Sequence, residues 1–206
     1  MNLEKIWHQF SPRQYSYLGD IVGNSSAKSV CEIGAFCGGV GRAVWQGIKD
    51  TDKELYLIDN YAFLPEHFRK HFFKAVKKTI SNSDRIHMLL ENSHEYDWTK
   101  HDFLIFSHAD FDHMEKDFDR LLDSKVKWVA LDLPKGCFKR TAKMLDAITN
   151  KKLFPSYYVD GMIICGPTTP CTLPTQEGTF LGHKVRYVEK KKGSYNKAVE
   201  DIVKNL

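Results

Sequence analysis

The sequence predicts an α/β domain in which helices cover both faces of one mostly parallel sheet of seven strands, with an antiparallel last strand. Short apolar strand patterns alternate five times with helical patterns along the chain. That alternation is typical of right-handed crossovers between parallel strands. The final third breaks the pattern, because two strand patterns there follow each other without a helix, and this favours antiparallel pairing.

The first helix is predicted by a capping box at residues 11–14, with Pro12 at the first helical position, and should end at Gly23. It belongs to an N-terminal helical region over residues 1–25. Apolar runs bounded by turn residues predict strands at residues 30–33, 55–58, 85–90, 103–106, 127–131, 157–165 and 184–188. Apolar positions at helical spacing predict the remaining helices at residues 40–48, 63–80, 114–122, 137–148 and 194–203.

Composition limits the class of protein. A chain of 206 residues with 42% hydrophobic content can bury one substantial core, so we expect a single domain over residues 1–206. Five cysteines without a C-x-x-C pair argue against a disulfide framework or a zinc ribbon and favour the reducing cytoplasm. No apolar run approaches the roughly 20 residues that span a bilayer, and the start lacks the apolar core of a signal peptide. We therefore expect no membrane contact.

The mild net charge of +4 comes in part from scattered Lys and Arg residues between Arg69 and Lys78. A solvated surface explains this scatter better than a phosphate-binding patch does.

A glycine turn follows the first predicted strand, and an acid ends the second. The turn contains Gly34 and Gly38 after Glu32, and Asp59 comes directly after residues 55–58. Glycine lets a backbone approach a ligand closely, and the helix beyond the turn presents unpaired N–H groups. An acid at the neighbouring strand tip can accept both hydroxyls of a ribose. The combination predicts a nucleoside-containing cofactor.

The spacing of the glycines separates the cofactor families. The dinucleotide fingerprint G-x-G-x-x-G would need glycine where Phe36 stands, and the variant G-x-x-x-G-x-G would need it at Val40. A P-loop would need Gly-Lys-Ser/Thr, whereas Gly41 is followed by Arg42. A nicotinamide-dependent oxidoreductase and a P-loop nucleotidase are therefore both disfavoured.

The remaining pattern, Glu-Ile-Gly-x-x-x-Gly-Gly over residues 32–39, resembles the first motif of class I S-adenosylmethionine-dependent methyltransferases. More narrowly, residues 32–38 resemble the catechol O-methyltransferase and macrocin O-methyltransferase branches, where the middle glycine is typically lost. The resemblance implies a Rossmann-like methyltransferase fold and S-adenosylmethionine as cofactor. The residues implied to bind this cofactor follow the first three strands: Glu32, Gly34, Phe36, Gly38, Gly39, Asp59, Asn92 and Ser93.

A second motif, His-Ala-Asp-Phe-Asp-His over residues 108–113, follows the fourth strand and resembles the His-Ile-Asp-Gly-Asp-His segment of the macrocin group. The resemblance implies that Asp110, with Asp132 after the fifth strand, binds Mg²⁺. Leu133 stands where the family has a second acid or asparagine. Carboxylates suit Mg²⁺, which keeps waters that a substrate diol could replace. Asp112 could be a third ligand, or either aspartate of the motif could cap the following helix.

His113 lies three residues beyond Asp110, where the macrocin type places a histidine. Histidine is a suitable general base for a sugar or phenol hydroxyl, so we assign His113 and Asp110 as catalytic. His94 and His101, expected on the same rim, are alternative bases. His67 and His71 have i, i+4 spacing but lack a neighbouring acid, and a solvated helix face explains them better.

Residues 166–181 include a long proline-rich segment. We expect it to emerge at the same sheet edge as the cofactor and to line the acceptor pocket. The alternative is a solvent-exposed linker.

The function that these observations favour is transfer of a methyl group from S-adenosylmethionine to an oxygen of a small molecule, a sugar or a phenol, with metal assistance. A methyltransferase acting on nucleic acid is the first alternative, although the Asn/Asp-Pro-Pro-Tyr/Phe motif of base-amine enzymes does not follow the fourth strand. A non-catalytic cofactor-binding protein is the second, and Leu133 supports it. A homodimer is compatible with the sequence, which does not determine the oligomeric state.

Overall fold

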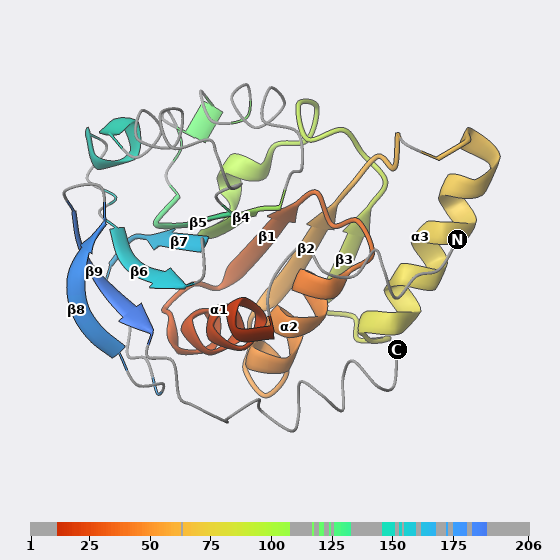
Figure 1. Ribbon diagram of the computed structural model, residues 1–206. Helices are drawn as coiled ribbons and strands as arrows, with labels where there is room; N and C mark the ends of the chain where they lie inside the picture. Colours follow the sequence, from red (N-terminus) through yellow and green to blue (C-terminus); the bar gives the residue numbers. More distant parts are fainter. Residues whose placement is uncertain are drawn as a thin grey trace.

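One large mixed sheet with helices packed against it makes up the computed structural model (Figure 1). The residues that it describes are 12–62, 64–107, 117, 120, 121, 124, 126–132, 146–150, 153, 155–159, 162–167, 172, 175–180 and 183–188.

The nine described strands form one sheet in the order β3-β2-β1-β4-β5-β7-β6-β9-β8. Strands β1 to β5 run parallel to one another, whereas β7 is antiparallel to β5. The α/β class and the mostly parallel sheet are confirmed, and the described strands exceed the predicted seven by two. Their bounds are β1 Ser29–Ile33, β2 Glu54–Ile58, β3 Ile86–Leu89, β4 Phe103–Phe106, β5 Trp128–Asp132, β6 Pro155–Val159, β7 Met162–Cys165, β8 Thr175–Phe180 and β9 His183–Val188.

Strand β1 lies between β2 and β4, and its residue Val30 pairs with Leu55 on one side and Phe103 on the other. Because β1 to β5 point the same way, their last residues lie along one side of the sheet, which we call the carboxyl edge. Their first residues lie along the opposite side, the amino edge. Open parallel sheets bind ligands beyond the carboxyl edge.

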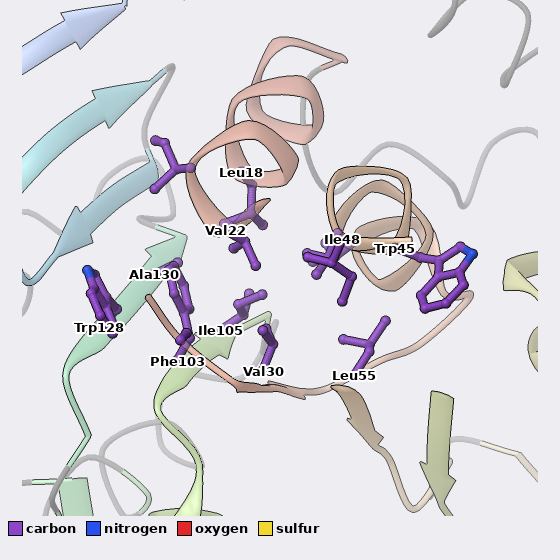
Figure 2. Packing of buried hydrophobic residues seen from close by; sticks show 14 of the residues in the cluster. Leu18, Val22, Val30, Trp45, Ile48, Leu55, Phe103, Ile105, Trp128 and Ala130 are labelled. Carbon is purple, nitrogen blue, oxygen red and sulfur yellow. The ribbon is translucent and has the colours of Figure 1, made fainter. Parts of the chain in front are cut away.

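Helices α1 (Pro12–Asn24), α2 (Gly39–Ile48) and α3 (Glu66–Ile80) pack on one face of the sheet. Figure 2 shows Leu18 of α1 and Ile48 of α2 above the strand residues of this face. The opposite face has its own core, in which Leu104 of β4 packs with Trp98 and Leu121. Side chains of a strand alternate between faces, so the apolar run of β4 supplies both cores. Burial on both faces is what its sequence pattern predicts.

Helices α1 and α2 approach each other closely because glycines lie at their contact. A Cβ atom added to Gly47 would overlap the carbonyl oxygen of Gly19, and one added to Gly23 would lie 2.5 Å from the carbonyl oxygen of Gly47. Backbone therefore packs directly on backbone here, and α1 is tied to the helix that follows the glycine turn.

The helices predicted at residues 12–23, 40–48 and 63–80 agree with α1, α2 and α3 to within three residues, whereas residues 1–11 of the predicted N-terminal helical region lie outside the described residues. Helix α3 starts at Glu66 instead of residue 63 because Pro65 disfavours helical backbone at Leu64. The helices predicted at residues 114–122 and 137–148 lie mostly outside the described residues, and the one at 194–203 lies wholly outside them. Their described parts, Asp117, Arg120, Leu121 and residues 146–150, are helical. None of the described helices is long and apolar enough to span a bilayer.

The prediction for the final strands is wrong in two respects. Residues 157–165 form two antiparallel strands, β6 and β7, in which Val159 pairs with Met162. The sequence between them is Asp-Gly, a strong signal for a two-residue hairpin that was overlooked. Strand β9 does not pair antiparallel with this segment, because it runs parallel to β6 and takes β8 as its antiparallel partner.

The proline-rich segment from residue 166 begins at the amino edge, not at the carboxyl edge. Strand β7 runs against β5, so its last residue, Cys165, pairs with Val129 near the start of β5. The Trp128 indole donates a hydrogen bond of 3.0 Å to the carbonyl oxygen of Pro167, and Thr172 donates to Asp20 of α1. The expectation that this segment starts beside the cofactor is therefore wrong, and its later part contains strand β8.

Candidate functional site

The turn between β1 and α2 is tightly coiled. Gly34, Phe36 and Gly38 all have positive φ angles, of 88°, 43° and 77°. Only Phe36 carries a side chain in this left-handed region, which is uncommon for an aromatic residue. A Cβ atom at Gly38 would press on Val76 and Ile80 of α3, so glycine is needed there for space as well as for conformation.

The end of β2 holds this turn through backbone hydrogen bonds. The Gly34 N–H donates to the carbonyl oxygen of Ile58 at 2.9 Å. The Asp59 carboxylate accepts from the Phe36 N–H at 2.8 Å and from the Tyr61 N–H at 2.7 Å. The structure thus brings Asp59 to the turn, as predicted. These two contacts fix the orientation of the carboxylate at the tip of β2.

Glu32 lies beneath the turn with only 1% of its surface exposed. Burial raises the pKa of its carboxyl well above the ordinary value, and the charge of Asp59 adds to the rise, while Ser107 and the Gly41 N–H favour the ionised form. Among the described residues, neither Oε2 of Glu32 nor Oγ of Ser107 has a hydrogen-bond partner of normal geometry. Two buried polar atoms without partners at neighbouring strand ends call for an explanation.

Ser107 is a residue that the sequence prediction missed. It comes directly after β4, and its N–H donates to the carbonyl oxygen of Ile33 at 3.0 Å, which holds it beside the tip of β1. A lone serine after a strand gives no signal by itself, because serine is an ordinary turn residue.

Asn92 and Ser93 lie in the loop after β3, and both side chains are engaged within the protein. Oδ1 of Asn92 accepts the His94 N–H at 3.0 Å. The Ser93 hydroxyl donates to Oδ2 of Asp117 at 2.6 Å. Their predicted contact with a cofactor remains a prediction.

Asp117 is the second missed residue. Its carboxylate is fully buried and lies 3.0 Å from Nδ1 of His94 as well as beside Ser93. Arg120, one helical turn later, donates to the carbonyl oxygens of Ser93 at 2.6 Å and Tyr96 at 2.8 Å. The spacing Asp-x-x-Arg puts both side chains on one side of a helix, but nothing in the sequence indicates what they face.

The alternative bases lie in different places. His94 is at the carboxyl edge beside Asp117, as expected. His101 lies at the amino edge, just before β4, and is only 4% exposed, so its placement on the same rim is wrong. Its ring nitrogen Nε2 lies 3.1 Å from the Tyr96 hydroxyl, and burial lowers the pKa of its imidazole to about 4. His67 and His71 are exposed on α3, as predicted.

The cysteine in the turn does not suit nucleophilic chemistry. Cys37 is a free thiol, and burial followed by the charge of Asp59 raises its pKa to about 11. The thiolate is the reactive form, so this residue stays protonated and unreactive near neutral pH.

The motif that was assigned the chemistry lies outside the described residues. Asp110, Asp112, His113 and Leu133 all belong to that part of the chain. For Asp132 the structure describes the backbone, which ends β5 at the carboxyl edge opposite Met162. Within the described part of the chain, no group of three His, Cys, Asp or Glu side chains could hold a metal.

No protein-family model matches the sequence, and no curated protein does either. Solved structures do match the fold. A methyltransferase from Podospora anserina, PaMTH1, solved with SAH bound, superposes with a TM-score of 0.51 at 14% identity, over 78% of this chain and 80% of that one. A predicted O-methyltransferase from Agrobacterium tumefaciens, Atu636, gives a TM-score of 0.51 at 13% identity, over 92% and 95%.

These likenesses define the class of fold. The chain has the Rossmann-like fold of class I S-adenosylmethionine-dependent methyltransferases, as the motif over residues 32–39 and the order of strands and helices predicted. At 13–14% identity the likeness supports the fold alone. Activity has to be inferred from the residues at the carboxyl edge.

Proposed function

We propose that this protein is a methyltransferase that moves the methyl group of S-adenosylmethionine to an oxygen of a small molecule, a sugar or a phenol. The observation that carries the proposal is a pair of buried oxygen atoms at the tips of β1 and β4, Oε2 of Glu32 and Oγ of Ser107, which make no hydrogen bond of normal geometry with any described residue. They lie beneath a glycine turn at the edge where parallel sheets bind ligands. Most buried polar atoms in stable proteins are hydrogen-bonded, so the two oxygens are candidates for contact with a ligand.

The cofactor's groups match what this edge offers. The buried carboxyl group of Glu32 suits the ammonium group of an amino acid, because a neighbouring positive charge would favour its ionised form. Asp59 is oriented by the N–H groups of Phe36 and Tyr61 at the tip of β2, and we assign it to the two ribose hydroxyls. Asn92 and Ser93, after β3, are the residues that we assign to the adenine ring.

When bound, S-adenosylmethionine supplies an electrophilic methyl group on a sulfonium. The chain has to hold the acceptor oxygen in line with that methyl carbon and remove its proton. We assign proton removal to His113, on the strength of its place in the motif after β4. His113 would accept the proton that the acceptor oxygen loses, and the cofactor held by Glu32 and Asp59 would supply the methyl group and leave as neutral S-adenosylhomocysteine.

A divalent cation is a separate part of the proposal. Asp110 and Asp132 would hold it, and it would lower the pKa of the acceptor hydroxyl. The backbone of Asp132 at the carboxyl edge is compatible with that role. No step above depends on the cation.

Calorimetry of the full chain with S-adenosylhomocysteine tests the core of the proposal. We expect micromolar binding with one site per chain, and clearly weaker binding for Glu32→Gln. A folded wild-type sample that gives no heat would overturn it. Release of S-adenosylhomocysteine in a panel of sugars and phenols, with and without EDTA, then tests the acceptor and the cation.

A second candidate, methylation of nucleic acid, is favoured by helix α3. This helix has five Lys and Arg residues against one acid, and none of the five forms an ion pair with a described residue: Arg69, Lys70, Lys74, Lys77 and Lys78. Phe68, on the same helix, is 55% exposed. A gel-shift with single-stranded RNA at two salt concentrations separates the candidates, because phosphate binding weakens steeply with salt. We expect no shift.

We also propose a reducing compartment, the cytoplasm. Its support is that Cys31, Cys37 and Cys165 are free thiols buried in the structure.

A further inference from the structure

Two side chains that follow β4 fix the shape of the loop that follows β3. Arg120 donates to the carbonyl oxygens of Ser93 and Tyr96, and its guanidinium lies 4.7 Å from the ring centre of Trp98. Asp117 binds the Ser93 hydroxyl and Nδ1 of His94. Apart from turns, this loop has no regular backbone structure before Trp98, so these contacts largely define its conformation.

The contacts also decide which hydrogen bonds the loop can offer. The Ser93 hydroxyl gives its only proton to Asp117, so towards any other partner it can act only as an acceptor. The Ser93 carbonyl oxygen accepts from both the Trp98 indole, at 3.1 Å, and Arg120. Both of its lone pairs are used, and the peptide plane at Ser93 is fixed.

A second arginine has the same arrangement at the amino edge. The guanidinium of Arg85 lies 4.8 Å from the ring centre of Trp45 and donates to the carbonyl oxygens of Lys49, Thr51 and Lys53. Here the fixed loop joins α2 to β2, on the side of the sheet away from the glycine turn. Arg85 therefore provides a matched control for Arg120, with the same chemistry and no link to the ligand edge.

We propose that Arg120 and Asp117 are positioning residues for the nucleoside cofactor. They hold residues 92–96 in the binding conformation before the ligand arrives, so that binding does not have to order this loop. The inference rests on the proposed function. It assigns part of the cofactor's affinity to two residues that follow β4 and contact residues 93–96 of the loop.

The test compares Arg120→Lys with Arg85→Lys by calorimetry, using S-adenosylhomocysteine and 5′-methylthioadenosine, which lacks the amino-acid part. Lysine keeps the charge but cannot bridge two carbonyl oxygens. We expect Arg120→Lys to weaken both ligands by about tenfold, because the loop must be ordered on binding. Arg85→Lys should change either affinity by less than about twofold. The two lysine variants should lower the melting temperature of the protein by similar amounts. Glu32→Gln should weaken S-adenosylhomocysteine far more than methylthioadenosine.

Equal affinities of wild type and Arg120→Lys, or equal weakening by both lysine variants, would overturn the inference and leave the proposed function intact. A wild type that binds neither ligand would overturn the proposed function, and the inference with it. If Arg120→Lys does not fold, Asp117→Asn takes its place, with the same expected loss for both ligands. Hydrogen exchange at residues 92–97 should be faster in the weakened variant, and unchanged exchange would contradict a positioning role.

Discussion

The carboxyl and amino edges of the sheet are both stabilised by an arginine that lies over a tryptophan, yet they differ in how completely their polar groups are satisfied. At the amino edge, Asp102 accepts the Lys28 N–H at 2.9 Å and lies 3.4 Å from the Lys127 ammonium. At the carboxyl edge, Glu32 and Ser107 each have a buried oxygen that makes no hydrogen bond of normal geometry with the described part of the chain. The amino edge also has one buried atom without a hydrogen bond, Nε2 of His87, but this atom lies 3.7 Å from Oε1 of Glu54. The same kind of loop fixation therefore occurs at two edges whose buried polar groups differ.

The difference teaches where function can be sought in a fold that many activities share. Buried polar groups are nearly always paired in stable proteins, and unpaired ones are tolerated where a ligand will meet them. Substitutions at the amino edge should therefore change stability without affecting ligand binding. Substitutions of Glu32 or Ser107 at the carboxyl edge should weaken ligand binding without lowering stability.

The largest effect is expected for Gly47→Ala, near the amino edge. The new methyl group would overlap the backbone of Gly19, which cannot move without separating α1 from α2. We expect a loss of about 3 kcal/mol or more in the free energy of unfolding, measured with urea. Gly41→Ala is the matched control, since its Cβ would meet the flexible end of Leu57 at 2.8 Å. A larger loss for Gly41→Ala would contradict the close backbone packing.

A smaller effect, which depends on pH, is expected at His101. Its folded pKa of about 4 lies below the ordinary value, so the unfolded chain binds this proton more readily. Stability from this group is therefore complete above pH ~6.5 and is lost as pH falls towards 4, by on the order of 3 kcal/mol. His101→Phe should flatten urea stability between these pH values, whereas His67→Gln, on an exposed helix, should not. An unchanged slope in His101→Phe would show that the imidazole is not buried in its neutral form.

The smallest effect on stability is expected for Glu32→Gln, at the carboxyl edge. The raised pKa of Glu32 means that the folded state binds this proton more tightly than the unfolded chain. The stability from protonation is present at low pH and is lost as pH rises through the raised pKa. Glutamine removes that loss, so the variant should match or exceed wild type in urea at pH 8. Its affinity for S-adenosylhomocysteine should nevertheless fall, and unchanged affinity would remove Glu32 from the site.

The sequence predicted those parts of the fold that depend on local patterns. Strand β4 was predicted with its observed bounds because its apolar run is short and bounded by polar residues. The antiparallel pairing of β6 with β7 was not predicted, although the sequence Asp-Gly between them is a common hairpin signal. The parallel pairing of β6 with β9 was not predictable, because strands far apart in sequence pair according to how the whole sheet packs.

Some residues of the candidate site could be predicted from local sequence, and others could not. Glu32, Gly34 and Asp59 could be named as candidates because they belong to one short motif and to the tip of the next strand. The hydrogen bond from the Phe36 N–H to Asp59 joins the motif to that strand tip. Asp117 lies 24 residues from Ser93, and Arg120 lies 27 residues from it, so their contacts follow from tertiary packing and not from spacing. His101 was misplaced because a loop that leaves one edge returns to the other before β4 begins.

The two arginine-covered indoles give this protein an internal pair of optical probes. Trp98 packs edge-on against Phe106 at the end of β4, and Trp45 lies on α2 beneath Arg85. A cation over an indole ring perturbs its fluorescence, so rearrangement of either arginine should change the emission of the tryptophan under it. Titration of variants that retain only Trp45 or only Trp98 of the chain's four tryptophans would report on each edge separately, without a label.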